Sequence, residues 1–297
     1  MDLEIVGSSG LRFVGLTISG ALVANSANIT LSHNTLTGMS VIQTQLPHAN
    51  IMFDSNRLDG INAGPNDYEG RITVRGYENN QPVGVTISNN HFGGGCSDGV
   101  QVTGGAYGVR IGPGNTFVGL RQRGCTPHVD PIQLYGGPHV VVRGNYFHDN
   151  GDGSGGLESF DGDDYGTVTN NVFVCTCDYP YSVAAMGGDN WLIEHNTFAG
   201  GGHVSFANAN DGDTASGNIV RNNVFTSGGG ISASGSAWGT NDHNLNAGMA
   251  GRANLKGTPV FVGGKKPQSY QGYRLARRSR GKGAASDGGD LGIRAHR

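Results

Sequence analysis

The sequence predicts an all-β fold, a right-handed parallel β-helix solenoid of about ten coils. Three observations indicate it. A short phrase of alternating apolar residues that ends in asparagine recurs along most of the 297 residues. Glycine contributes 53 residues without a Gly-X-Y period, which excludes collagen. Hydrophobic residues make up 36% of the chain, a composition that suits many short strands joined by tight turns better than a thick globular core.

The repeated phrase ends at an asparagine, which most repeats follow two residues later with phenylalanine or leucine. We interpret each unit as a short strand, a corner marked by asparagine, and one residue that returns to the interior. Asparagine tolerates the left-handed conformation of a sharp corner, and stacked amides can hydrogen-bond between coils. We therefore expect a structural role for these anchors, which are spaced by 21 to 34 residues: Asn34, Asn56, Asn90, Asn115, Asn145, Asn171, Asn196, Asn223 and Asn244.

A second strand precedes each phrase, and its period-two alternation predicts which side chains point inward. The predicted interior column is Ile42, Ile72, Val100, Ile132, Leu157, Val183, Val204 and Ile231. The predicted outward column beside it is Gln43, Thr73, Gln101, Gln133, Glu158, Ala184, Ser205 and Ser232. A second outward column, two residues further on, is Gln45, Arg75, Thr103, Tyr135, Phe160, Met186, Ala207 and Ser234.

Charge divides the chain into two parts. Residues 1–249, the predicted β-helix, carry a net charge of −12 and contain no lysine, whereas residues 250–297 carry +9. An acidic body disfavours nucleic-acid binding, because affinity for phosphates requires clustered cations. We expect the basic C-terminal segment to close the last coil or to pack along the helix.

Cysteine usage and the N-terminus bear on the cellular compartment. Cys96, Cys125, Cys175 and Cys177 form no CxxC pair, so one or two disulfides in an exported protein are favoured over a metal site. A Cys96–Cys125 bridge is more plausible than Cys175–Cys177, which would close a strained ring. No apolar run is long enough for a membrane span, and no signal peptide is recognisable. We expect a soluble, secreted or extracellular protein whose signal is absent from this sequence.

The first coil is predicted to lack a cap, because no amphipathic helix precedes Leu3. Exposed strand edges invite pairing with another chain. We therefore expect either that the sequence is truncated at this end or that a partner chain, which can be a second copy of the protein, covers the first coil.

These features resemble the superfamily of right-handed parallel β-helix proteins that contains pectate lyases, alginate lyases and epimerases, and polygalacturonases. The resemblance rests on the repeat phrases of residues 1–249 and concerns the fold more than the chemistry. It implies a carbohydrate-active enzyme with a polysaccharide substrate and, for the pectate-lyase-like members, the use of Ca²⁺.

The best candidate site lies on two adjacent coils that carry a near-duplicate sequence. Cys96-Ser-Asp98-Gly-Val-Gln101 and His128-Val-Asp130-Pro-Ile-Gln133 are expected to stack about 4.8 Å apart. The predicted catalytic residues are His128, Asp130, Glu158 and Arg123. The predicted substrate-binding residues are Gln101, Gln133, Tyr135, Phe160, Arg75, Arg121, Tyr181 and His203. The predicted calcium ligands are Asp98, Asp130, Glu158, Asp161 and Asp163.

Three functions compete for this cluster. A lyase would neutralise a uronate carboxylate, remove the C5 proton and protonate the leaving oxygen, and in an acidic groove it would need Ca²⁺ to reverse the local charge. A glycoside hydrolase would use Asp130 and Glu158 as its two carboxylates. The polygalacturonase pattern is not met, since Asp163-Asp164 and Gly202-His203 lack its spacing, and the epimerase pattern Asp-Pro-His is absent, since Asp130-Pro131 is followed by Ile132.

The third function is a non-catalytic adhesin or carbohydrate-binding scaffold, which predicts an even spread of polar residues along the groove. Each candidate also has a purely structural interpretation. Gln101 and Gln133 can form a surface amide ladder, and Asp98 and Asp130 can cap turns through backbone N–H groups. The clustering of polar residues between positions 96 and 181 favours an enzyme.

Overall fold

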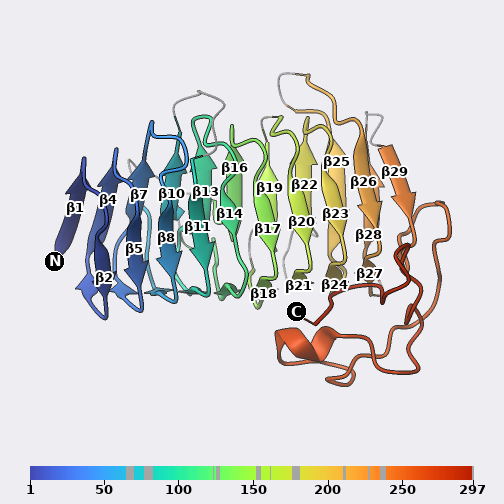
Figure 1. Cartoon of the computed structure of the whole chain (residues 1–297). Helices are drawn as coiled ribbons and strands as arrows, with labels where there is room; N and C mark the ends of the chain where they lie inside the picture. The colour runs from blue at the N-terminus through green and yellow to red at the C-terminus, as the bar shows by residue number, and fades with distance from the viewer. Residues whose placement is uncertain are drawn as a thin grey trace.

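The chain forms a parallel β-helix in the computed structural model, in which every third strand is a neighbour in the same sheet (Figure 1). The structure describes residues 1–64, 70–76, 83–122, 124, 128–151, 155–160, 162–175, 181–209, 212–226, 228–234 and 239–295. The described strands belong to three parallel sheets, called sheets 1, 2 and 3 here. This arrangement confirms the predicted solenoid.

Along each sheet, the order of the strands follows the chain. Sheet 1 contains β1 (Asp2–Val6), β4 (Gly20–Ala24), β7 (Ser40–Gln43), β10 (Gly70–Arg75), β13 (Asp98–Thr103), β16 (Ile132–Tyr135), β19 (Leu157–Ser159), β22 (Tyr181–Met186), β25 (His203–Ala207) and β28 (Gly230–Ala233). Sheet 2 contains β2 (Arg12–Val14), β5 (Ile29–Ser32), β8 (Ile51–Asp54), β11 (Val85–Ser88), β14 (Arg110–Ile111), β17 (Val141–Arg143), β20 (Thr167–Thr169), β23 (Leu192–Glu194), β26 (Asn218–Arg221) and β29 (Gly239–Asp242). Sheet 3 contains β3 (Thr17–Ile18), β6 (Thr35–Leu36), β9 (Arg57–Asp59), β12 (His91–Gly93), β15 (Thr116–Val118), β18 (Tyr146–His148), β21 (Val172–Val174), β24 (Thr197–Ala199) and β27 (Val224–Phe225).

The predicted asparagine anchors form a buried amide ladder between sheets 2 and 3. The Nδ2 atom of Asn145, for example, donates to Oδ1 of Asn171 at 3.1 Å, and Asn171 donates to Asn196 at 3.0 Å. Asn244 in turn accepts from Asn223 and donates its backbone N–H to Oδ1 of Asn254. The ladder therefore runs one position beyond the predicted boundary at residue 249.

The left-handed corner residue is not the ladder asparagine, as the sequence interpretation had it, but the residue before it. These preceding residues have φ between 48° and 85° and are His33, Ser55, Asn89, Gly114, Gly144, Asn170, His195, Asn222 and His243. The division has a physical reason. The ladder side chain must point inward from regular backbone, whereas the residue outside it makes the turn.

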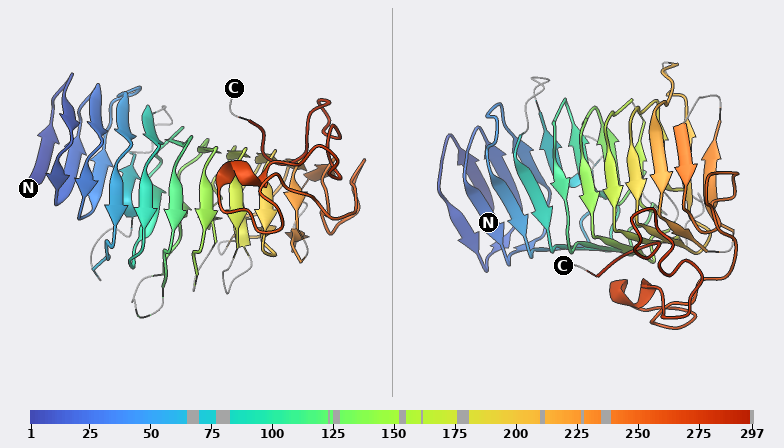
Figure 2. Two further views of the ribbon diagram at one scale, coloured as in Figure 1. Left: turned by 90° about the horizontal axis from the view of Figure 1, so that it is seen from below. Right: turned by 45° about the vertical axis from the view of Figure 1, so that its right-hand side comes forward.

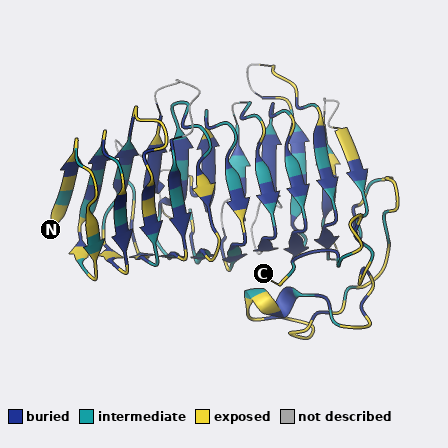
Figure 3. Cartoon of the chain, viewed as in Figure 1, coloured by how far each residue is buried: buried dark blue, intermediate teal, exposed yellow. Residues whose placement is uncertain are grey.

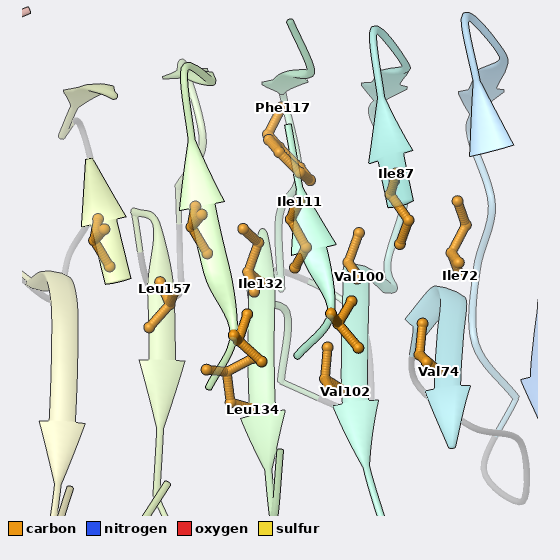
Figure 4. Close-up of a cluster of buried hydrophobic side chains, with 14 of the residues drawn as sticks. Ile72, Val74, Ile87, Val100, Val102, Ile111, Phe117, Ile132, Leu134 and Leu157 are labelled. Atoms are coloured by element: carbon orange, nitrogen blue, oxygen red, sulfur yellow. The ribbon is translucent and has the colours of Figure 1, made fainter. Parts of the chain in front are cut away.

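The interior is a column of apolar layers, shown in part in Figure 4. The phenylalanines two residues after the ladder stack on one another, with ring centroids 4.5 to 5.2 Å apart from Phe92 to Phe225. The predicted interior column of sheet 1 is buried throughout. Its register is as predicted from β10 onward, but Ile42 pairs with Val74 and Gln43 with Arg75, so the prediction for β7 was wrong by two residues.

The basic C-terminal segment turns back beneath the last coils and lies along sheet 3 (Figures 1 and 2). It contains a 3₁₀ helix, η1 (Tyr270–Tyr273). Leu291 and Ile293 pack with Val172 and Val224 of sheet 3 in a second apolar cluster. The backbone N–H of Arg294 also donates to Asn170 at 2.7 Å. The segment thus packs along the helix, which was one of the two arrangements expected.

Strands β1, β2 and β3 stand at the ends of their sheets, so the described first coil has an open edge. The last residues of β1 and β2, Val6 and Val14, are exposed. Figure 3 colours the exposed parts of the chain yellow. Self-association at this coil stays a prediction. Among the described residues, no helix is long and apolar enough to cross a membrane.

Both cysteines in the described residues, Cys96 and Cys175, are disulfide-bonded, as expected for bridged cysteines. Cys125 and Cys177 lie outside the described residues. The predicted pairing therefore stays a prediction.

Candidate functional site

The candidate site lies where strands β13, β16 and β19 stand side by side in sheet 1. Residue pairing places Gln101 beside Gln133 and Gln133 beside Glu158, as predicted. Asp98 begins β13, and Asp130 comes two residues before β16. Residues more than thirty positions apart in sequence are thereby neighbours on consecutive coils.

His128 and Asp130 form a close pair in which only the histidine is accessible. Nδ1 of His128 lies 3.2 Å from Oδ2 of Asp130, and the exposed fractions of the two side chains are 52% and 3%. The contact with the carboxylate favours the tautomer in which Nδ1 carries the proton. Nε2 then keeps its lone pair and is the nitrogen available to a substrate.

Asp98 has a structural role beneath this pair. Its Oδ1 atom accepts the backbone N–H of Asp130 at 2.7 Å, and Asp98 is fully buried. This contact is the capping of a backbone N–H group that the structural interpretation of Asp98 predicted. It holds the backbone of Asp130 in the position from which its side chain reaches His128.

The two glutamines form an amide ladder that leads to the histidine. Nε2 of Gln101 donates to Oε1 of Gln133, and Nε2 of Gln133 lies 3.5 Å from Nδ1 of His128. Gln133 is buried, whereas Gln101 is partly exposed. The predicted surface ladder therefore exists, and it lies within the same cluster as His128.

Glu158 is a carboxyl group of the cluster with a strongly raised pKa. Burial is the largest cause and the nearby charge of Asp130 adds to it, so that the pKa reaches about 8 although His128 acts in the opposite direction. Burial disfavours the charged form because a carboxylate loses its hydration, and a neighbouring negative charge acts in the same direction. Glu158 is therefore predominantly protonated at neutral pH and can donate a proton or a hydrogen bond.

The predicted calcium ligands are not brought together as a set. Among the described residues, Asp98, His128 and Asp130 lie close enough to bind one metal ion, since their ligand atoms are within 4.8 Å of one another. Asp163 lies elsewhere, because its carboxylate accepts from Ser159 Oγ and from the backbone N–H of Gly137. Ca²⁺ takes six to eight oxygen ligands. The two carboxylates and the imidazole of this group alone fall short of that number, and Asp161, another predicted ligand, lies outside the described residues.

Aromatic and cationic side chains flank the cluster. The ring of Phe160 meets His128 edge-on, with centroids 6.4 Å apart. Tyr135, at the end of β16, is 56% exposed. It pairs with Thr103, and Thr103 pairs with Arg75, so these three residues form one row across sheet 1. The second outward column is thus confirmed for these strands.

Other predicted substrate-binding residues lie further away. Tyr181 and His203 pair with each other at the starts of β22 and β25, beyond the coil of Glu158. Arg121 follows β15, and its Nη2 atom lies 3.5 Å from the carbonyl oxygen of Asp149. Arg123 lies outside the described residues.

Sequence reasoning missed Arg71, which binds Ser97, the residue before Asp98. Arg71 is fully buried and donates to the carbonyl oxygens of Leu58 and Gly93 and to Ser97 Oγ. Burial lowers its pKa to about 10, and the negative charges of Asp59 and Asp98 oppose that effect. The only sequence signal was an arginine one residue before the interior column, where a buried charge is unexpected.

Comparisons with known proteins gave one family model and one solved structure to report. A family model described as "Right handed beta helix region" matches residues 72–245. A solved structure of the Dettilon tailspike protein (gp208) is 14% identical, with a TM-score of 0.41, and the alignment covers 86% of this chain but only 62% of that one. No curated protein matches. Since the family model spans more than half of the sequence, the chain belongs to the right-handed β-helix family.

Proposed function

We propose that this protein cleaves the glycosidic bonds of a polysaccharide, and that it acts as a lyase on a uronate-containing polymer. One observation carries the proposal. A carboxyl group that is protonated at neutral pH, Glu158, lies close to an accessible histidine that a buried aspartate orients. A carboxyl group with a strongly perturbed pKa beside an accessible histidine is typical of active sites, and an acid beside a base is what bond cleavage requires.

The reaction assigns one role to each group. Nε2 of His128 removes the C5 proton of the uronate, and the electrons of that C–H bond form the C4–C5 double bond. The C4–O bond breaks, and Glu158 protonates the departing oxygen. Asp130 is a positioning residue, because it is buried and acts through His128.

The substrate carboxylate needs hydrogen-bond donors, because its charge must be stabilised as the C5 proton leaves. The amide groups of Gln101 and Gln133 lie in the same column as Glu158 and supply neutral donors. Neutral donors suit an acidic protein body, since they add no further negative charge. Arg75, in the row of Tyr135, adds a cation at the end of β10 in the same sheet.

Assistance by Ca²⁺ is a separate part of the proposal, and no catalytic step above depends on it. Activity measured after chelation, and again after calcium is restored, tests it. Loss followed by recovery would support calcium assistance, whereas unchanged activity would contradict it.

A glycoside hydrolase is the second candidate. The observation in its favour is that the charge of Asp130 raises the pKa of Glu158, which requires the two carboxyl groups to lie near each other. Two carboxyl groups with different protonation states are the usual equipment of such enzymes. The burial of Asp130 disfavours it, because a base that activates water must reach that water.

Incubation with polygalacturonate and with alginate distinguishes the functions. A lyase produces unsaturated uronates, which absorb in the ultraviolet, in step with new reducing ends. Reducing ends without that absorbance would indicate the hydrolase, and polymer binding without any product would indicate a binding scaffold. Glu158→Gln is the matched control, since it is close in size to glutamate and has no proton to give.

A further inference from the structure

Three aromatic side chains on consecutive coils contact one another at the corner between sheets 1 and 2, where the rings of His139 and Tyr165 stack and the ring of Tyr107 is tilted against that of His139. The ring centroids of Tyr107 and His139 lie 4.3 Å apart, and those of His139 and Tyr165 lie 4.5 Å apart. His139 follows Tyr135 by four residues across this corner. The aromatic cluster therefore lies at the corner that follows the exposed Tyr135 at the end of β16.

The backbone at this corner is left-handed in nine consecutive coils of the described residues, with φ between 52° and 75°. The register of sheet 2 aligns one left-handed residue in each of these coils with its counterpart in the next coil. Each of these residues lies directly before a strand of sheet 2 or two residues before its first residue. They are Gly10, Asn28, Asn50, Gly84, Gly108, His139, Tyr165, Asn190 and Gly217. All but two are glycine or asparagine, the residues that tolerate this conformation best.

His139 and Tyr165 are thus exceptions in this column, because its other members are the glycine and asparagine that a left-handed backbone favours. A left-handed conformation is unfavourable for a bulky side chain, because Cβ crowds the following carbonyl oxygen. Backbone strain of this kind concentrates at functional sites. The two strained residues are also those whose rings stack together.

The outer ring face of Tyr165 is open. One face lies against His139, yet the residue remains 49% exposed. The next residue of the column, Asn190, leans the other way, since its Oδ1 atom occupies the space that a side chain at Gly217 would need. An aromatic face of this kind offers an apolar surface with a fixed orientation.

We infer that the outer face of Tyr165 binds a pyranose ring of the polysaccharide, with His139 and Tyr107 fixing the orientation of the platform. This inference rests on the proposed function and adds a binding subsite at the corner to the cluster on sheet 1. The C–H face of the sugar stacks on the ring, which places this contact several residues along the coil from the catalytic groups.

Tyr165→Asn tests the inference, because it gives the position the residue that its neighbours in the column have. The variant is expected to be retarded less in gels that contain polygalacturonate or alginate, with a dissociation constant about fivefold to tenfold higher. Its Tm is expected to rise, because the strain is relieved. Tyr165→Phe keeps the ring and is the matched control, with retardation close to that of the wild type.

The outcomes separate the subsite from the activity. Unchanged retardation of Tyr165→Asn, or a lower Tm, would overturn the platform even if the wild type cleaves these polymers. If the gels do not retard the wild type, the platform is also overturned for these polymers, and the cleavage assay with the same polymers then decides separately on the proposed function.

Discussion

Nδ1 of His128 lies 3.2 Å from Oδ2 of Asp130, a contact that joins an accessible side chain to a buried one. The two residues are separated by a single position in sequence, at the entry to β16. Their different exposure divides the work of the site. The histidine can meet a substrate, and the aspartate can only orient the histidine and modify the charge around Glu158.

Glu158→Gln should lower kcat by about 10² to 10⁴, the usual contribution of a general acid. The amide keeps the size of the side chain but cannot protonate the leaving oxygen. Binding of uncleaved polymer, measured by gel retardation, should remain within a few-fold of the wild type. A variant with normal kcat would remove Glu158 from the mechanism.

Asp130→Asn should lower kcat and also change the pH profile. Loss of the negative charge lowers the pKa of Glu158, so the decline of activity at high pH should begin at a lower pH than in the wild type. The profile of kcat/KM against pH checks this. A merely structural role would reduce the amount of folded enzyme without moving that limb of the profile.

Folding stability should depend on pH through Glu158. Its pKa is about 8 in the folded protein against an ordinary value of 4.5, so the folded state binds the proton more tightly than the unfolded state. The contribution of Glu158 to stability is therefore present at low pH and is lost as the pH rises from 4.5 towards about 8. Denaturant unfolding of the wild type and of Glu158→Gln over this range measures it. An equal pH dependence of the two proteins would contradict the raised pKa.

The repeat made most of the fold predictable. Period-two alternation and the asparagine anchors identify the buried columns, because a stack repeats the same environment in every coil. The same logic brought Gln101, Gln133 and Glu158 together. It failed where a coil departs from the repeat, as at Gln43, where the insertion before β10 hides the register.

The chemistry of the site was less predictable than its location. Sequence alone showed neither that Asp130 is buried while His128 is accessible, nor that Asp163 turns to Ser159. Those features depend on how corners and loops fold over the sheet, and the corner residues do not follow the strand alternation. The aromatic stack at the corner escaped notice for the same reason, since Tyr165 belongs to no strand.

Asn171→Ala should destabilise the protein by about 2–5 kcal/mol. The side chain accepts the backbone N–H of Asn145 and donates to Asn196 and to the carbonyl oxygen of Val142. Its removal leaves these groups buried without their partner. Urea unfolding measures the loss, and Arg110→Ala, an exposed position on β14, should change stability by less than about 0.5 kcal/mol. Equal effects of the two substitutions would show that the ladder adds little.

Leu291→Ala should show whether the C-terminal segment folds as one unit with the coils. Leu291 is fully buried in the cluster that joins the segment to sheet 3, so truncation removes apolar contacts at about 2–5 kcal/mol. If the segment is integral, Tm falls and trypsin cleaves its many basic residues sooner. Val262→Ala, at an exposed position of the same segment, is the control and should change neither property. Faster cleavage with an unchanged Tm would instead mean that the segment detaches while the coils stay folded, because each coil depends mainly on its neighbours.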